Sequence, residues 1–381
     1  MSGSQGAGSE SATGLAPGRP ALALRALTKR FGDVAAVDGV DLEVMPGEFI
    51  TLLGPSGSGK TTTLRIIAGF TAQTSGTIDI DGLDMSNVPP YRRDVGMVFQ
   101  NYALFPHMTA AENIAFPLEM RNAGKAEIKR RVAEALQLVQ LPYHGDRYPR
   151  QLSGGQQQRI ALARAIVFRP RLLLMDEPLG ALDKKLRESL ELEILHISRQ
   201  VGATVVYVTH DQEEALVMSD RIAIFRDGRI EQAGTGEDLY DRPASLFVAD
   251  FIGESNILRG RFTRDGTGGW LVREGWRGRI SPAAMAGAGV EDGAAAALVV
   301  RPERLEVRSA DEPDREGENS MAATIRDILF LGSLRKYELV LPTGEPLVVR
   351  SPIEPTSHRP GEAVRVAWAV ERGVLVADPA A

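Results

Sequence analysis

The stretch Gly54-Pro55-Ser56-Gly57-Ser58-Gly59-Lys60-Thr61 fits the pattern G-x-x-x-x-G-K-[ST]. The apolar run Phe49 to Leu53 in front of it predicts a buried strand, and Thr62 to Ala68 behind it predicts a helix. In this context the loop is typical of a phosphate-binding loop, because its backbone N–H groups and the helix dipole attract an anion. Lys60 is placed to reach the β- and γ-phosphates of a nucleotide, and the Thr61 hydroxyl to ligate Mg²⁺. The alternative is a glycine-rich turn with a chance lysine, which the flanking elements disfavour.

Two carboxylates follow a second apolar run. The segment Arg171 to Glu177 has four apolar residues before Asp176 and Glu177, which predicts a buried parallel strand with acids at its C-terminal end. Ligands of open α/β sheets bind at that end of the strands. Asp176 therefore suits Mg²⁺, and Glu177 suits a base that polarises the attacking water. The alternative is an acidic helix cap, because Pro178 follows.

A second helix start also has anion-binding chemistry. Ser153 is placed as the N-cap of a helix that is predicted to run to about Val167, and Gly154 and Gly155 leave backbone N–H groups exposed behind it. The same pattern is compatible with a plain helix cap.

Two single side chains fit a nucleotide site, each with an ordinary alternative. His210 follows the β-rich run Thr204 to Thr209 and is placed to donate to a γ-phosphate, although a lone histidine is more often a packed or surface residue. Phe31 precedes the phosphate-loop strand and suits stacking on an adenine ring or packing at the edge of a core.

The bulk properties limit the function. The chain has 381 residues, which favours two domains, and a net charge of -6 with a pI near 5.6, so we expect no nucleic-acid partner. Cysteine is absent, which excludes disulfides, thiolate metal sites and cysteine nucleophiles. No apolar run reaches the roughly 18 residues of a membrane span. Residues 1–20 predict a disordered leader rather than a secretory signal, so a cytosolic protein is expected.

The middle of the chain alternates between strand and helix patterns. We expect a strand from Val95 to Phe99, a helix from Lys125 to Leu141, and a hairpin around Asp227-Gly228. Beyond about Tyr240 the pattern changes to short strands with turn signals, typical of a small β-barrel or sandwich. These strands are expected at Ile257–Phe262, Trp270–Val272, Ala297–Val300, Arg304–Val307, Ala323–Leu331, Lys336–Leu341, Leu347–Arg350 and Ala363–Ala369.

Six elements in one order resemble the ATP-binding subunit of an ABC transporter. They are similar to its phosphate loop, glutamine loop, signature motif, acidic strand, aspartate loop and histidine switch. The elements are Gly54–Thr61, Gln100, Leu152–Gln156, Leu172–Glu177, Gly180–Asp183 and His210. The resemblance implies an α/β P-loop NTPase core with a helical subdomain at 21–240, followed by a small all-β domain at 241–381 that resembles the OB-like TOBE barrel and would be regulatory.

The resemblance also implies a sandwich of two copies of the chain, in which each ATP lies between the phosphate loop of one copy and Ser153–Gln156 of the other. Glu177 would be the base, His210 would contact the γ-phosphate, and Gln100 would link Mg²⁺ and water to the membrane partner. Asp183 would reach across the dimer, and Phe31 would stack on adenine. The implied ATP-binding residues are Phe31, Gly54, Pro55, Ser56, Gly57, Ser58, Gly59, Lys60, Thr61, Thr62, Ser153, Gly154, Gly155, Gln156 and Asp183. The implied metal-binding residues are Thr61, Gln100 and Asp176.

The C-terminal part resembles importer ATPases. Val300-Arg301-Pro302-Glu303 is similar to their β-barrel extension, and the segments Ser86–Thr109, Phe251–Leu258 and Leu331–Ser333 look most like the spermidine/putrescine branch. The implied partners are two integral-membrane permease subunits and, through them, a periplasmic or extracellular solute-binding protein. The subunit would be peripheral at the cytoplasmic face of the inner membrane.

Several alternatives remain at the level of sequence. Importers of this kind also take sugars, ferric iron or sulfate. ABC ATPases in DNA repair or translation are a second class, although they typically carry two ATP modules, a long coiled coil or zinc-binding cysteines. A regulatory module whose C-terminal part senses a ligand is a third reading. The aromatic segment Tyr102–Phe116 fits a dock for a permease helix or simple packing of the helical subdomain.

Overall fold

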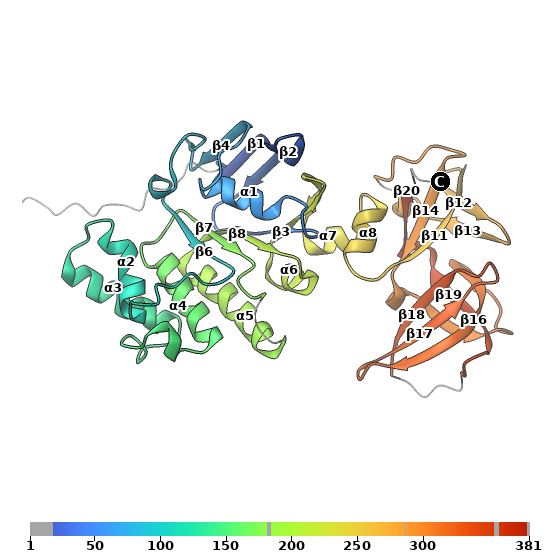
Figure 1. The fold of residues 1–381 in the computed structure, drawn as a ribbon. Coiled ribbons are helices and arrows are strands. Elements are labelled where there is room, and N and C mark those ends of the chain that lie inside the picture. Colours follow the sequence, from blue (N-terminus) through green and yellow to red (C-terminus); the bar gives the residue numbers. More distant parts are fainter. Residues whose placement is uncertain (1–17, 181–183, 286, 354–357, 379–381) are drawn as a thin grey trace, which may run out of the picture. The chain divides into compact units, whose positions relative to one another are not determined.

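The computed structural model describes residues 18–180, 184–285, 287–353 and 358–378 (Figure 1). The chain divides into two compact units, Met1–Ile230 and Glu231–Ala381. The predicted domain boundary followed residue 240, ten residues after the observed division at 230. Most of the predicted leader, residues 1–17, lies outside the described residues.

A six-stranded sheet forms the centre of the first unit, in the order β10-β9-β3-β8-β7-β6. Parallel pairing joins β6 to β7, β7 to β8, β8 to β3 and β3 to β9. Every residue of β3, β7 and β8 is buried, which explains why these strands are almost continuously apolar in sequence. The strands are β3 Phe49–Leu53, β6 Val95–Val98, β7 Leu172–Asp176, β8 Thr204–Thr209, β9 Arg221–Arg226 and β10 Arg229–Gly234.

A four-stranded antiparallel sheet, in the order β2-β1-β4-β5, covers the phosphate-loop helix α1. One apolar core contains side chains of both sheets together with Leu64, Ile66 and Ile67 of α1, so the helix is enclosed between them. Helix α1 spans Lys60–Ile67 and begins two residues before the predicted start at Thr62, because the loop glycines lead directly into its first turn. The strands are β1 Leu22–Phe31, β2 Val34–Val44, β4 Ser75–Ile80 and β5 Leu83–Asp84.

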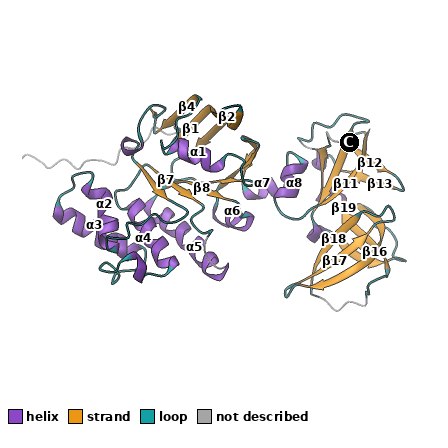
Figure 2. Ribbon diagram, viewed as in Figure 1, coloured by secondary structure: helices purple, strands orange, loops and turns teal. Residues whose placement is uncertain are grey.

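The second unit consists mainly of strands (Figure 2). Two five-stranded antiparallel sheets, β13-β12-β11-β14-β20 and β15-β19-β16-β17-β18, share one apolar core, as the predicted barrel or sandwich requires. The strands are β11 Asn256–Asp265, β12 Gly268–Arg273, β13 Trp276–Ile280, β14 Ala295–Val300, β15 Glu306–Ser309, β16 Glu318–Phe330, β17 Leu334–Val340, β18 Pro346–Pro352, β19 Ala363–Ala369 and β20 Gly373–Ala377.

Three features of this unit differ from the sequence prediction. Arg304 belongs to a 3-10 helix, Pro302–Arg304, because the preceding Pro302 favours a helical turn, and the strand starts only at Glu306. Strands β13 and β20 were not predicted, since Gly278 and the short length of each run obscure the alternation. Two short helices, α7 Gly236–Asp241 and α8 Leu246–Phe251, precede the first strand, and Thr235 and Ser245 cap them.

Arg301 explains why the short helices stay in place. Its side chain is almost fully buried, and its guanidinium donates to Tyr240 O at 2.8 Å and to Ala249 O at 2.8 Å. The guanidinium also lies 4.0 Å from the centre of the Tyr240 ring. One side chain of the Val300–Glu303 motif therefore satisfies carbonyl groups at the ends of α7 and α8.

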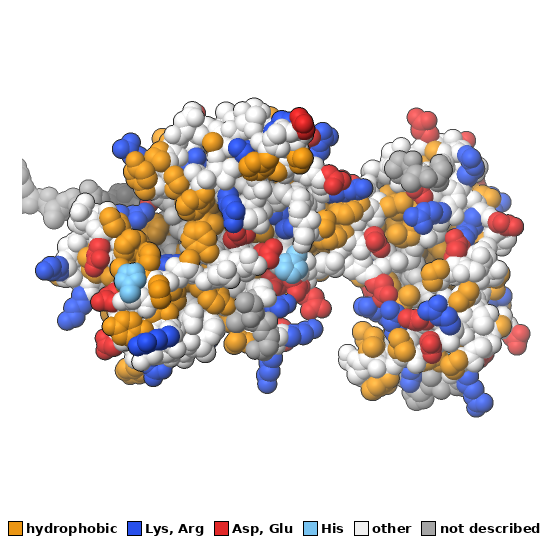
Figure 3. Space-filling model, in the orientation of Figure 1, with side chains coloured by type: hydrophobic (Ala, Val, Ile, Leu, Met, Phe, Trp, Pro, Cys, Tyr) orange, Lys and Arg blue, Asp and Glu red, His pale blue; other side chains and the backbone are white. Residues whose placement is uncertain are grey.

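The surface has mixed charge. Acidic and basic side chains are interspersed over the face shown in Figure 3, without one large basic patch. In the described ranges, no helix is both long and apolar enough to cross a membrane.

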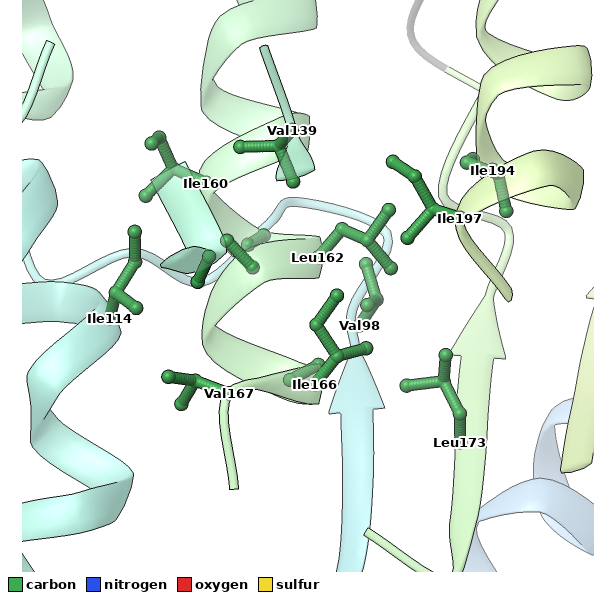
Figure 4. Close-up of a cluster of buried hydrophobic side chains, with 14 of the residues drawn as sticks. Val98, Ile114, Val139, Ile160, Leu162, Ile166, Val167, Leu173, Ile194 and Ile197 are labelled. Carbon is green, nitrogen blue, oxygen red and sulfur yellow. The ribbon is translucent and has the colours of Figure 1, made fainter. Parts of the chain in front are cut away.

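The remaining helices of the first unit are α2 Ala110–Glu119, α3 Lys125–Leu138, α4 Gly154–Ile166, α5 Lys184–Val201 and α6 Gln212–Met218. Figure 1 shows α2, α3 and α4 grouped together, and they contact one another. Their core contains Ile114, Ile160, Leu162 and Ile166 and reaches Val98 of β6 (Figure 4). Helix α3 ends at Leu138, three residues before the predicted Leu141.

Candidate functional site

The phosphate loop is crowded by backbone from other segments. A Cβ atom on Gly59, whose φ is 105°, would lie 2.4 Å from Ala36 O, and one on Gly54 would lie 2.3 Å from Phe225 O. Gly228 N also donates to Ser58 O at 3.1 Å. Only glycine fits at Gly54 and Gly59, so the fold forces these backbone N–H groups into a tight, side-chain-free curve.

Lys60 lies inside this curve. Its ammonium donates to Gly54 O at 2.8 Å and to Pro55 O at 2.9 Å, and its side chain is buried. Burial lowers the Lys60 pKa, although the Glu177 and Asp176 carboxylates oppose that change. The loop therefore holds a cation at the concave side of its own backbone, where a phosphate group would be bound.

Thr61 and Asp176 bring two oxygen ligands together. Thr61 Oγ1 donates to Asp176 Oδ1 at 3.2 Å, across the space between α1 and the end of β7. Burial raises the Asp176 pKa, and the hydrogen bond from Thr61 opposes this. Hydroxyl and carboxylate oxygens are the ligands that Mg²⁺ prefers, and Mg²⁺ usually keeps only one or two protein ligands beside substrate phosphates.

Glu177 is the point where three strand ends converge. Its Oε2 atom lies 3.4 Å from Gln100 Nε2 and 3.2 Å from His210 Nδ1. Gln100 follows β6, Glu177 follows β7 and His210 follows β8, and these are neighbouring parallel strands. The sheet thus brings the three predicted catalytic residues to one edge, as expected for strand C-termini.

The Glu177 backbone adopts an uncommon conformation. Its φ is 43°, in the left-handed region, and its N–H donates to Val208 O at 3.0 Å. This conformation costs a non-glycine residue roughly 1–3 kcal/mol and persists where the surroundings fix it. The hydrogen bond to Val208 of β8 anchors this backbone beside the strand that His210 follows.

A buried group behind His210 was missed in the sequence. Glu214 Oε2 accepts from Tyr207 Oη at 2.9 Å and from Thr209 Oγ1 at 2.7 Å, which ties helix α6 to strand β8. Asp211 caps the same helix by accepting from Glu213 N at 2.8 Å. Burial raises the Glu214 pKa. The acidic run after His210 was the available signal, because carboxylates favour a helix N-terminus.

The second predicted anion site lies at the start of α4. Ser153 Oγ accepts from Gln156 N at 3.3 Å, and Gln156 Oε1 accepts from Ser153 N at 3.0 Å, so the predicted N-cap is a reciprocal capping box. Within the described ranges, no hydrogen bond or ion pair joins Ser153–Gln156 to the phosphate loop of the same chain. The structure therefore groups Lys60, Thr61, Asp176, Glu177, Gln100 and His210, and places Ser153–Gln156 at the start of α4.

Two of the remaining predicted ATP-binding residues, Phe31 and Thr62, lie in the described part of the chain. Phe31 ends β1 with a largely exposed ring, and Lys29 Nζ lies 4.9 Å from its centre. Thr62 lies in the first turn of α1. Asp183 lies outside the described residues.

Comparison with known proteins gives consistent results. Residues 37–180 match the family described as ABC transporter, and residues 298–376 match the TOBE domain. The Spermidine/putrescine import ATP-binding protein PotA of Rubrobacter xylanophilus is 50% identical over 354 residues, covering 92% of each chain. The protein of the same name from Thermobifida fusca is 51% identical, over 84% of this chain and 83% of its own.

Two solved structures match part of the chain. A dimeric bacterial ABC transporter cassette is 37% identical, with a TM-score of 0.51, and the match covers 56% of this chain and 98% of that one. A dimeric post-hydrolysis state of an ATP-binding cassette, bound to ADP and Pi, is 35% identical, with a TM-score of 0.50 and the same coverage.

Proposed function

We propose that this chain, which belongs to the ABC transporter family of ATP-binding subunits, drives the import of spermidine and putrescine. It is an ATPase with an α/β P-loop core and a C-terminal TOBE domain. The observation that carries the proposed mechanism is the convergence of Gln100 and His210 on one oxygen of Glu177.

Each residue of the cluster has a defined chemical role. Glu177 is the general base that takes a proton from the attacking water, and its partly exposed carboxylate leaves room for that water. His210 donates to the γ-phosphate from the other side of Glu177. Gln100 donates to the same carboxylate and thereby orients it. None of these groups forms a covalent bond to phosphate, so the catalysis consists of positioning and charge stabilisation.

Mg²⁺ fits between Thr61 and Asp176, where it would neutralise charge on the β- and γ-phosphates. The Thr61 hydroxyl and the Asp176 carboxylate, which lie 3.2 Å apart, would hold the ion together with the Gln100 side-chain oxygen. Lys60 and the backbone N–H groups of Gly54 and of Ser56–Thr62 bind the phosphates, and Pro55 contributes no donor because proline has no N–H. The exposed Phe31 ring would stack on the adenine.

A second copy of the chain completes each site. Ser153, Gly154, Gly155 and Gln156 present a capped helix start, and in the described part of the chain no hydrogen bond or ion pair joins it to the phosphate loop. Such a helix start binds anions, which suits the γ-phosphate of an ATP bound to the partner copy. The dimeric state of the similar cassettes supports this arrangement. Asp183 would reach across the same interface.

The transported solute and the partners follow from the relatives. Their names specify spermidine/putrescine import, and the identity extends over most of both chains. An import ATP-binding subunit requires a membrane pathway, so we assign two integral-membrane permease subunits and an external solute-binding protein as partners. The subunit would then sit on the cytoplasmic face of the inner membrane, with residues 241–381 as a regulatory domain.

Uptake and partner capture test this function together. Cells that carry the wild-type chain should accumulate labelled spermidine or putrescine, whereas cells with Glu177→Gln should not, although that variant should co-purify with permease subunits from membranes in the presence of ATP. Glu213→Gln is the matched control, because Glu213 is exposed and pairs only with Lys184 among the ion pairs of the described chain. Uptake of a sugar, ferric iron or sulfate that depends on this chain, with unchanged polyamine uptake, would overturn the substrate. Recovery of ribosomal or DNA-repair proteins without a membrane protein would overturn the transport function.

A further inference from the structure

The backbone after Gln100 turns through two strained residues. Tyr102 has a φ of 57° and Ala103 a φ of 48°, so two consecutive non-glycine residues occupy the left-handed region. Such residues persist only where the surrounding structure fixes them, and they gather at functional sites. This turn begins two residues after Gln100, the residue that donates to Glu177.

One side chain holds both strained residues. Arg164 Nη1 donates to Ala103 O at 2.7 Å, and Arg164 Nη2 donates to Tyr102 O at 2.8 Å. The planar guanidinium has its donors in a fixed fork, which matches two neighbouring carbonyl oxygens in one geometry. A single ammonium group cannot reproduce that fork.

Arg164 is an unusual cation in its surroundings. It is 8% exposed, and no carboxylate in the described part of the chain forms an ion pair with it. Burial lowers its pKa. A buried charge without a carboxylate partner is costly to keep, and among the described residues its hydrogen bonds go to the Tyr102 and Ala103 carbonyl oxygens. The fold therefore retains a buried charge whose hydrogen bonds hold the backbone of Tyr102 and Ala103, just after Gln100.

The position of Arg164 links two parts of the ATP sandwich. It lies in the last turn of α4, the helix that Ser153 caps and whose first turn carries Gln156. Its helix neighbours Leu162 and Ile166 belong to the rigid core with Val98, the last residue of β6 before Phe99 and Gln100 (Figure 4). The signature segment and the glutamine loop are thus attached to one helix.

We propose that Arg164 is a positioning residue that holds Gln100 in the orientation needed at Glu177 and couples that orientation to the signature helix. The inference rests on the proposed sandwich, in which the signature segment serves the partner's ATP while Gln100 serves its own. When α4 moves at the ATP of the partner copy, the orientation of Gln100 then changes at the ATP of its own chain. Arg164 itself does not contact ATP in this arrangement.

Arg164→Lys tests the proposal in the full-length chain. This variant keeps the charge and most of the volume but loses the fork. We expect kcat for MgATP hydrolysis to fall by about 10- to 100-fold, the size of effect that small misplacement of catalytic groups produces. ATP affinity and the unfolding temperature should change little. Arg159→Lys is the control, since Arg159 lies on the same helix but pairs with Glu193 on α5. A kcat equal to that of the control would overturn the proposal.

A double-mutant cycle separates positioning from general stability. If Arg164 acts through Gln100, Arg164→Lys should slow a Gln100→Ala chain no further, whereas losses that multiply would show that Arg164 acts elsewhere. Gln100→Ala alone reports on the proposed catalytic role of Gln100. A Gln100→Ala chain that hydrolyses ATP normally would contradict the proposed role of Gln100. Losses of Arg164→Lys and Gln100→Ala that multiply would contradict only the inference about Arg164.

A second variant covers the case in which Arg164→Lys folds poorly. Ala103 is exposed, so Ala103→Val leaves the core intact but places a β-branched residue where φ is positive. Ala103→Gly is its matched partner, because glycine adopts the same conformation freely. The valine chain should turn over ATP more slowly than the glycine chain. Equal kcat values would show that the loop conformation does not control hydrolysis.

Discussion

Replacement of Glu177 by Gln is the sharpest test of the catalytic cluster. The change keeps the size of the side chain and one oxygen, which can still accept from Gln100 Nε2 or from His210 Nδ1 at the distances of 3.4 and 3.2 Å. It removes the ability to take a proton, together with the negative charge that acts on the Lys60 pKa. A positioned base contributes about 10²- to 10⁴-fold to a rate, which corresponds to about 2.7–5.4 kcal/mol of activation free energy.

The comparison of kcat with ATP affinity tests whether Glu177 acts as the base. Because Glu177 forms no hydrogen bond with the phosphate loop in the described structure, ATP affinity should be nearly unchanged while kcat falls. Steady-state phosphate release with MgATP gives kcat, and titration with a fluorescent ATP analogue gives the affinity. Glu213→Gln removes a carboxylate from the exposed first turn of α6 and should behave as wild type. Hydrolysis by Glu177→Gln at the rate of that control would refute the reasoning, because the cluster would then lack its base.

Three further changes test other parts of the structure. Asp176→Asn should raise the unfolding temperature in Mg²⁺-free buffer at mildly alkaline pH. Burial raises the pKa of the Asp176 carboxyl in the folded chain above its value in the unfolded chain. The ionised carboxylate therefore lowers the stability of the fold at every pH above the raised pKa. Thermal melts should show the gap closing as the pH falls through the raised pKa, and a less stable Asn chain would contradict this. Ser153→Ala should lower the free energy of unfolding by about 1 kcal/mol, because the capping hydrogen bond is lost. In a Glu177→Gln background the same change should abolish the ATP-trapped dimer in size-exclusion chromatography, while ATP binding persists. A dimer that still forms would argue against the sandwich. Arg301→Met should destabilise the unit Glu231–Ala381 by about 2–4 kcal/mol, because it leaves the Tyr240 and Ala249 carbonyls without their donor; denaturation followed by tryptophan fluorescence reports this, since the chain's three tryptophans all lie in that unit, and an unchanged midpoint would show that Arg301 does not hold the helices.

The strands that are buried on both faces were predictable, because they are short apolar runs with clear ends. Phe49–Leu53 and Leu172–Asp176 were placed correctly by that pattern alone. Edge strands such as Trp276–Ile280 were not, since charged residues and a glycine interrupt the alternation. The start of α1 at Lys60 depends on the backbone path of the glycine loop, which residue propensity does not report.

The site shows the same division. Ser153 was identified as a helix cap because capping is local and depends on residues three positions apart. Glu214 was not identified as a support for the His210 segment, because its bonds to Tyr207 and Thr209 depend on how α6 packs on β8. Arg164 gave no signal, since its partners lie about sixty residues away in the chain.

The chemistry of this protein can be identified from residue type and local spacing, because the phosphate loop, the acidic strand end, the capped helix start and the six motifs in order are all local patterns. Which of these groups meet depends on how the strands and helices pack. The parallel order β8-β7-β6 puts His210, Glu177 and Gln100 at one sheet edge. The α4 helix brings Arg164 to two strained carbonyls that follow Gln100. These contacts join residues distant in the chain, and they form only because burial of the apolar strands and helices fixes the elements against each other.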